Sequence, residues 1–180
     1  MKKICKKISS GFTLIETLVA ISIFTVSIIL LMSVLGNGIS DINNVKKKIL
    51  AGYLAQEGIE YIRNMRDTYV LYSTLGSGKD WDKFKIEFNP CNLGNECGFS
   101  TTNPIVISKC TSNPSVCKIY LDNGNYNTTS SGEDSGFTRK IWTDVVGDGE
   151  LKIYSEVEWI QRSGTQRIVF SENLFNWTEQ

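Results

Sequence analysis

The chain has 180 residues, of which 41% are hydrophobic and 21% are charged, and its 19 basic residues balance its 19 acidic ones. This length and composition predict one modest globular domain, and the zero formal net charge gives no indication of a specific nucleic-acid-binding surface. The sequence has no histidine, the commonest general base and zinc ligand, and it lacks Gly-x-Ser-x-Gly and Walker A motifs. We therefore expect a protein that is not an enzyme and that needs no cofactor.

A lysine-rich leader precedes a long apolar segment at the N-terminus. Residues 1–11 contain four lysines and no acid, and the run from Thr17 to Ser40 has no charged residue. A helix needs about 20 apolar residues to cross a bilayer, whereas the apolar core of a signal peptide has only about 7–15. Because basic residues stay on the cytoplasmic side, this pattern predicts a single-pass protein of the cytoplasmic (inner) membrane, oriented N-in and C-out.

Glu16 lies at the front of this apolar segment. An ionisable side chain in a membrane span is costly and rare, so it suggests a functional role with a specific partner. A plain uncleaved anchor for an external domain explains the hydropathy but leaves this carboxylate without a purpose. The simple alternative to a functional role is that the Glu16 side chain reaches back to the membrane interface, where its carboxylate stays hydrated.

The motif Gly11-Phe12-Thr13-Leu14-Ile15-Glu16, between a lysine-rich leader and an apolar helix, resembles the N-terminus of type IV prepilins and pseudopilins. The resemblance is strong over residues 1–40 and weaker beyond them. It implies that a prepilin peptidase cuts between Gly11 and Phe12 and that the new amino group of Phe12 is methylated. It also implies that Glu16 meets the N-terminal amine of a neighbouring subunit during filament assembly.

The physical chemistry of these residues agrees with that implication. Gly11 has no side chain, so a protease can approach the backbone closely there. Cleavage creates a positive amine at Phe12, and both this amine and the Glu16 carboxylate are costly in lipid unless they are paired. Such a pair would act as a register device between neighbouring helices.

The partners that the resemblance implies are prepilin peptidase, other pilin subunits, the membrane and, indirectly, an inner-membrane platform protein and an assembly ATPase. The leading interpretation is a minor type IV pilin, which is finally located in an extracytoplasmic pilus or pseudopilus. A pseudopilin of a type II secretion system is an alternative. A membrane-anchored extracytoplasmic binding or adhesive module that never polymerises is another. The sequence does not distinguish a major from a minor subunit, nor adhesion, motility, DNA uptake or secretion.

Five cysteines indicate an oxidising environment. Cys5 lies in the leader and would leave with it, whereas Cys91, Cys97, Cys110 and Cys117 remain, and their spacing does not fit a zinc ribbon. These four allow three disulfide connectivities. We favour the local pairs Cys91–Cys97 and Cys110–Cys117, each of which would contribute roughly 2–3 kcal/mol by loop-entropy arguments.

The predicted fold class is α+β, with a long N-terminal helix packed on a C-terminal antiparallel β-meander. The predicted segments are a cytoplasmic leader (1–11), a transmembrane and assembly helix (12–40), an amphipathic second half of this helix (41–68), and an extracytoplasmic β-rich head (69–180). One helix from about Phe12 to about Asp67 would be roughly 80 Å long at 1.5 Å per residue.

Helical periodicity continues past the span from Lys46 to Asp67. The residues predicted to share one buried face are Leu50, Ala51, Leu54, Gly58, Tyr61, Ile62 and Met65. Gly36 and Gly38 lie near the junction between the transmembrane half and the amphipathic half of the predicted helix. Because glycine destabilises a helix interior by about 1 kcal/mol, they mark either a bend or a tolerated glycine pair.

Alternating patterns predict three long strands: Thr138 to Val146, Leu151 to Ile160 and Gln166 to Leu174. Shorter strands are expected at Phe84 to Phe88, Ile105 to Ser108 and Lys118 to Leu121. The polar stretch Asn123 to Gly136 predicts an exposed loop.

Two side-chain groups are candidate ligand sites. Asp144, Asp148 and Glu150 surround a glycine-rich turn and form a weak calcium candidate, although acids in an exposed turn are usually just solvated. Trp142, Tyr154 and Trp159 could form an aromatic patch, although such residues more often fill the core of a small sheet.

Overall fold

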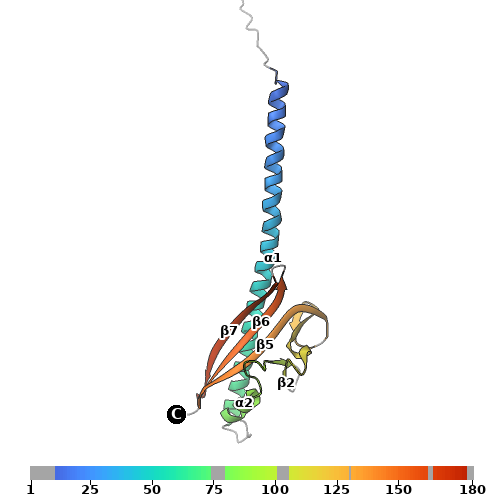
Figure 1. Cartoon of the computed structure of the whole chain (residues 1–180). Helices are drawn as coiled ribbons and strands as arrows, with labels where there is room; N and C mark the ends of the chain where they lie inside the picture. Colours follow the sequence, from blue (N-terminus) through green and yellow to red (C-terminus); the bar gives the residue numbers. More distant parts are fainter. Residues whose placement is uncertain (1–10, 74–79, 101–105, 130, 162–163, 178–180) are drawn as a thin grey trace, which may run out of the picture. The chain divides into compact units, whose positions relative to one another are not determined.

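The structure of the chain is a computed structural model that describes residues 11–73, 80–100, 106–129, 131–161 and 164–177 (Figure 1). Its elements are the helices α1 (Leu14–Ser73) and α2 (Trp81–Phe88), the strands β1 (Cys97–Ser100) and β2 (Val106–Lys109), a 3-10 turn η1 (Pro114–Cys117), and the strands β3 (Lys118–Asp122), β4 (Asn125–Asn127), β5 (Glu133–Gly147), β6 (Glu150–Gln161) and β7 (Gly164–Phe175). This confirms the predicted α+β class with a long N-terminal helix and a C-terminal antiparallel sheet.

The chain divides into two compact units, one ending at Val45 and one beginning at Lys46. The first unit contains the N-terminal part of α1, which is helical through both Gly36 and Gly38. The glycine pair is therefore tolerated within a regular helix. The predictions for the leader, Cys5 among them, fall on residues 1–10 and lie outside the described part of the chain.

The second unit is built on one antiparallel sheet. Strands β5, β6 and β7 form the predicted meander, with β6 between β5 and β7. The opposite edge of β5 pairs with β3 over its first residues and with β1 at Ile141, and β4 and β2 extend these two branches. The three long strands run further than the hydrophobic alternation predicts because their ends continue to pair beyond the last buried residue.

The core lies between the sheet and the C-terminal part of α1. The predicted stripe on α1 faces the sheet: Ala51, Leu54, Gly58, Ile62 and Met65 are buried, and Leu50 and Tyr61 are partly buried. From the sheet, alternate residues of β5 and β6 point towards this stripe, because side chains on a strand alternate between its two faces. These buried strand residues include Phe137, Ile141, Ile153, Val157 and Trp159.

The segment Phe84 to Phe88 is not the predicted strand but the end of helix α2. Asp80 caps this helix by accepting a hydrogen bond from the Lys83 N–H at 2.8 Å. Trp81, Phe84 and Phe88 are all buried, and their spacing of three and four residues is helical. A short apolar run is compatible with the periodicity of either a strand or a helix, and here the N-cap at Asp80 favours the helix.

Two further predictions needed correction. The stretch Asn123 to Gly136 is not wholly a loop, because it contains β4 and the start of β5. Asn123 and Gly124 both have positive φ, 49° and 83°, as the tight turn of a β-hairpin requires. The helix α1 also ends later than Asp67, at Ser73.

Candidate functional site

The motif Gly11 to Glu16 forms the entry to helix α1. Thr13 is the residue before the helix; its carbonyl oxygen accepts from the N–H groups of Glu16 and Thr17 at 3.1 and 3.2 Å, and its hydroxyl oxygen accepts from the Glu16 N–H at 3.4 Å. Threonine satisfies the free N–H groups of a helix start in this way. Glu16 lies in the first turn, where its negative charge is favourable beside the helix N-terminus.

Gly11 and Phe12 lie outside the helix and are exposed. A Cβ added to Gly11 would meet no atom within 4 Å, and the Phe12 side chain is 80% exposed. No contact within the described chain therefore requires glycine at position 11, and both residues of the Gly11–Phe12 peptide bond are exposed.

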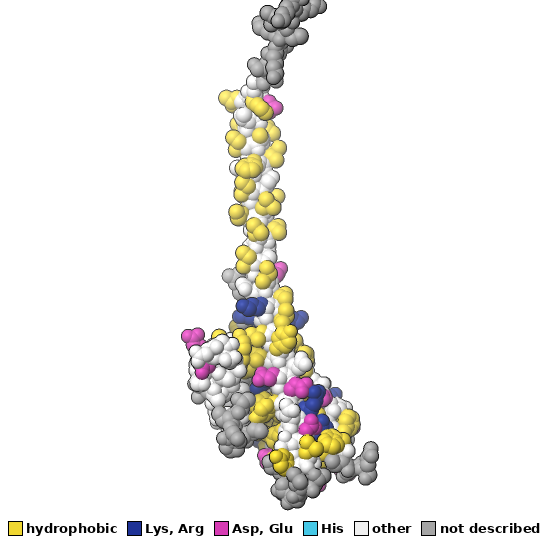
Figure 2. All heavy atoms as spheres, turned by 180° about the vertical axis from the view of Figure 1, so that it is seen from behind, with side chains coloured by type: hydrophobic (Ala, Val, Ile, Leu, Met, Phe, Trp, Pro, Cys, Tyr) yellow, Lys and Arg dark blue, Asp and Glu magenta, His cyan; other side chains and the backbone are white. Residues whose placement is uncertain are grey.

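Helix α1 is long and apolar enough to span a membrane, judged by its length and composition. Its large apolar side chains from Leu14 to Leu35 are exposed within the described chain, and Figure 2 shows them over the N-terminal part of the helix. The hydroxyl groups of Thr17, Ser22, Thr25 and Ser27 donate to helix carbonyl oxygens three or four residues earlier, at 2.8–2.9 Å. These hydroxyls can enter lipid without losing their hydrogen bonds.

Glu16 is thus an ionisable side chain directly before the uncharged part of α1, from Thr17 to Ser40. The next acidic residue along the chain is Asp41. A carboxylate in this position needs a cation when it enters an apolar environment. The Glu16 carboxylate can therefore supply one half of an ion pair.

The cysteines of the head form the two local disulfides favoured from their spacing. The Cα atoms are 5.4 Å apart in Cys91–Cys97 and 5.7 Å apart in Cys110–Cys117. Cys91 and Cys97 are buried in the larger core cluster, where they join the end of α2 to β1. The second disulfide joins the end of β2 to the end of η1, so each bond fixes a short segment to its neighbour.

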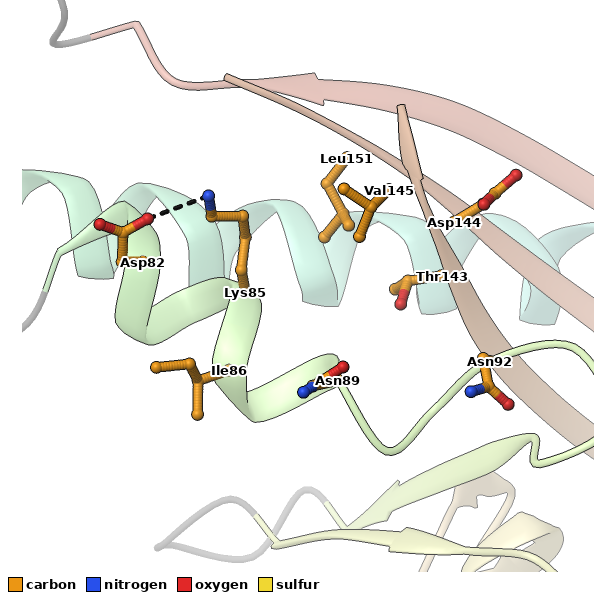
Figure 3. Close-up of a pocket in the computed structure, with 9 residues that line it drawn as sticks. All are labelled: Asp82, Lys85, Ile86, Asn89, Asn92, Thr143, Asp144, Val145 and Leu151. Atoms are coloured by element: carbon orange, nitrogen blue, oxygen red, sulfur yellow. Dashed lines mark ion pairs between the residues drawn. The ribbon is translucent and has the colours of Figure 1, made fainter. Parts of the chain in front are cut away.

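A pocket of about 580 Å³ lies between α2 and the end of the β5–β6 hairpin (Figure 3). Its rim holds the Asp82–Lys85 ion pair at 2.9 Å, and the Lys85 ammonium also donates to the Asp148 carbonyl oxygen at 3.1 Å. The Thr143 hydroxyl donates to the Cys91 carbonyl oxygen at 3.0 Å. Because that hydroxyl is already engaged, the described lining offers no free hydroxyl nucleophile with an adjacent base.

The calcium candidate is not assembled. Asp144 lies on β5, the Asp148 backbone carbonyl accepts from Trp81 and Lys85, and the Glu150 carboxylate accepts from Asn173. Among the described residues, no group of three or more histidine, cysteine or acidic side chains is placed to hold a metal ion.

The three aromatic residues divide between the two faces of the sheet. Trp159 is buried and packs beside Phe137 in the core. Trp142 and Tyr154 lie on the other face, stacked with ring centroids 5.1 Å apart, and the Lys152 ammonium lies 5.2 Å from the centre of the Tyr154 ring. The core interpretation is correct for Trp159 only.

The sequence interpretation missed a buried charge, Arg139. Its guanidinium donates to the Leu54 carbonyl oxygen at 3.1 Å and to Glu57 at 3.0 Å, and lies over the Phe99 ring. Burial lowers the pKa of Arg139, and the carboxylate of Glu57 opposes this shift. The sequence position of Arg139 could have indicated its burial. Arg139 lies two residues after Phe137 and two before Ile141, so all three side chains lie on the inward face of β5.

Comparison with known proteins agrees with the N-terminal site. Residues 6–32 match the family model of the prokaryotic N-terminal methylation motif, and this match covers Gly11, Phe12 and the first part of α1. No curated protein and no solved structure matches the chain. The match and the exposed apolar helix fit membrane anchoring. The chain carries the prepilin-type cleavage and methylation signature of type IV pilins and pseudopilins.

Proposed function

We propose that this chain is a minor type IV pilin, a structural subunit without catalytic activity that is processed by prepilin peptidase and joins a filament through α1. The supporting observation is the arrangement of Gly11, Phe12 and Glu16. An exposed peptide bond precedes the helix, and a single carboxylate lies one turn inside an apolar surface that nothing in the described chain covers.

The proposed mechanism has three steps. The peptidase cuts the Gly11–Phe12 bond on the cytoplasmic side, and the new amine is methylated. The Glu16 carboxylate of a neighbouring subunit then pairs with this amine, so that one stagger between the two helices neutralises both charges. During assembly, the apolar side chains of α1 replace their contacts with lipid by contacts with neighbouring helices. The charge pair sets the register between two helices, and the packing of the apolar side chains holds the filament together.

The N-terminal residue tests the first step. Mass measurement of the processed chain is expected to find an N-terminal methylated Phe12. An intact Met1 or a cut elsewhere would contradict the proposal. It would support the alternative of a membrane-anchored adhesive module that does not polymerise.

Glu16 needs a design that separates its charge from its place in the first helical turn. The sequence Thr13-Leu14-Ile15-Glu16 has the form of a capping box, and glutamine serves in that role as well as glutamate. We expect Glu16→Gln and Glu16→Ala to insert and to be cleaved normally, yet both to be strongly depleted from sheared filaments. Asp41→Asn is the matched control on the same helix. Normal incorporation of Glu16→Gln would refute the charge pair and assign the residue to helix capping.

A pseudopilin of a type II secretion machine uses the same motif. Quantifying this chain against other pilins in purified sheared filaments distinguishes the two assignments. A minor pilin is expected in the filament at a low ratio, whereas a pseudopilin would be absent from surface pili and needed for secretion.

A further inference from the structure

Within the described chain, no strand pairs with the outer edge of strand β7. There, β6 is the one strand that pairs with β7, through twelve consecutive residue pairs without a bulge. The Phe175 carbonyl oxygen points away from β6 and accepts from Arg66 on α1 at 2.8 Å, while the Asn176 N–H points back to the Gly149 carbonyl oxygen. Since backbone groups alternate along a strand, every second residue of β7 faces outward.

The outward-facing residues are Thr165, Arg167, Val169, Ser171 and Asn173, and all five are exposed. Within the described residues, their N–H and C=O groups form a row that no strand pairs with. Exposed edges are normally protected by charged side chains, proline, a bulge or a covering segment. β7 contains no proline, its register has no bulge, and Arg167 is the one charged residue among these five.

A groove of about 320 Å³ runs beside this edge, between β7 and α1. The apolar side chains in its lining include Ile59 on α1 and Phe170 on β7. One end is charged: the Arg63 guanidinium bonds both Glu60 and Glu172, so two carboxylates surround one cation. A strand added to β7 would place alternate side chains over this groove.

We propose that the β7 edge and its groove form an acceptor site for an extended segment of a partner protein, which adds to the sheet as an eighth strand. Strand addition obtains its affinity from backbone hydrogen bonds and its specificity from the pockets that receive alternate side chains. An antiparallel segment would carry a basic residue opposite Glu172, small β-branched residues opposite Phe170 and Ile168, and an acid opposite Arg167. This proposal does not depend on cleavage or on filament assembly.

A second copy of β7 fits this edge less well. β7 runs in the same direction as the adjoining part of α1, since Gly52 lies near Phe170, Arg63 bonds Glu172 and Arg66 bonds Phe175. Two β7 strands paired antiparallel would therefore turn the adjoining parts of their α1 helices in opposite directions. We therefore infer that the added segment comes from a different element.

The test uses the full chain in detergent micelles and the peptide acetyl-Lys-Thr-Val-Thr-Val-Glu-amide. We expect saturable binding, with slower hydrogen exchange confined to the amides of Thr165 to Asn173. N-methylation of both threonines, whose N–H groups would face β7, is expected to abolish binding. N-methylation of both valines, whose N–H groups would face away, should leave binding within about threefold.

A variant of the chain provides the complementary test. Val169→Pro removes one outward N–H and leaves the pairing with β6 intact, a position at which an edge strand tolerates proline. We expect at least tenfold weaker peptide binding with little change in melting temperature. If the variant does not fold, the two N-methylated peptides decide the matter on the unaltered chain.

Three results would overturn the proposal. Equal binding of both N-methylated peptides would show apolar adhesion without strand pairing. Protection at the α2–β5 pocket instead of β7 would move the site. Protection of β7 that grows with protein concentration in the absence of peptide would assign the edge to a second copy.

Discussion

Replacing Gly58 by alanine measures how closely α1 approaches the sheet. A Cβ at this position would lie 2.5 Å from the Ser155 hydroxyl oxygen and 3.1 Å from Cδ of Arg139. Alanine favours a helix over glycine by about 1 kcal/mol, whereas overpacking a filled core costs about 1–3 kcal/mol. We therefore expect Gly58→Ala to lower the free energy of unfolding by about 1 kcal/mol, although alanine is the better helix former.

Gly52 provides a matched control in the same helix. The nearest atom to a Cβ at Gly52 is Phe170 Cζ, at 4.0 Å, which is ordinary contact. Gly52→Ala should therefore gain the helix propensity alone, up to about 1 kcal/mol. The difference between the two variants isolates the steric cost at Gly58. Adding Ser155→Gly to Gly58→Ala removes the clashing hydroxyl, which has no hydrogen-bond partner among the described residues, and should recover part of the loss.

The assay is urea unfolding of the full chain in detergent micelles, followed by the fluorescence of the buried Trp81 and Trp159. The two alanine variants should move the transition midpoint in opposite directions without changing its slope. Equal stabilisation by Gly58→Ala and Gly52→Ala would refute the close approach of α1 to β6.

Two further stability predictions follow from the head. Replacing Cys91 and Cys97 together by serine should lower the free energy of unfolding by at least about 2 kcal/mol, because loop entropy and core packing are both lost; unchanged thermal unfolding would contradict this. Burial, and then the charge of Glu158, raises the pKa of Glu156 above the ordinary 4.5. A carboxyl whose pKa is raised on folding disfavours the folded state once it ionises. Glu156→Gln should therefore be more stable than the unaltered chain at neutral pH, and the difference should disappear below pH 4.5 in pH-dependent melting curves.

The parts of the fold that the sequence predicts are those with a repeated pattern. The stripe from Ala51 to Met65 and the alternation within β6 each extend over several periods, so one face can be assigned with little ambiguity. Spacing favours the local disulfides over the other two connectivities, because short loops bring Cys91 to Cys97 and Cys110 to Cys117 at little cost in chain entropy. The N-terminal motif is a local signal and needs no tertiary contact to be recognised.

The remaining features depend on contacts between distant residues or on weak local signals. The segment Phe84 to Phe88 is too short for its period to be decisive, and its cap at Asp80 was the missed signal. Asn123-Gly124 is a typical sequence for a tight hairpin turn. The residues around it are almost all polar, so the segment was interpreted as a loop. Arg139 could be placed on the inward face by alternation, but its partner Glu57 lies 82 residues away.

The two disulfides also bear on how the head reaches its native state in a living cell. Cys91 is joined to the next cysteine in the sequence, and Cys110 to the one that follows it. A thiol oxidase acting on the nascent head as it emerges, N-terminal end first, would therefore produce the native pairs simply by joining cysteines in their order of appearance. Neither bond has to wait for β5, β6 and β7, so biogenesis should proceed without a disulfide isomerase.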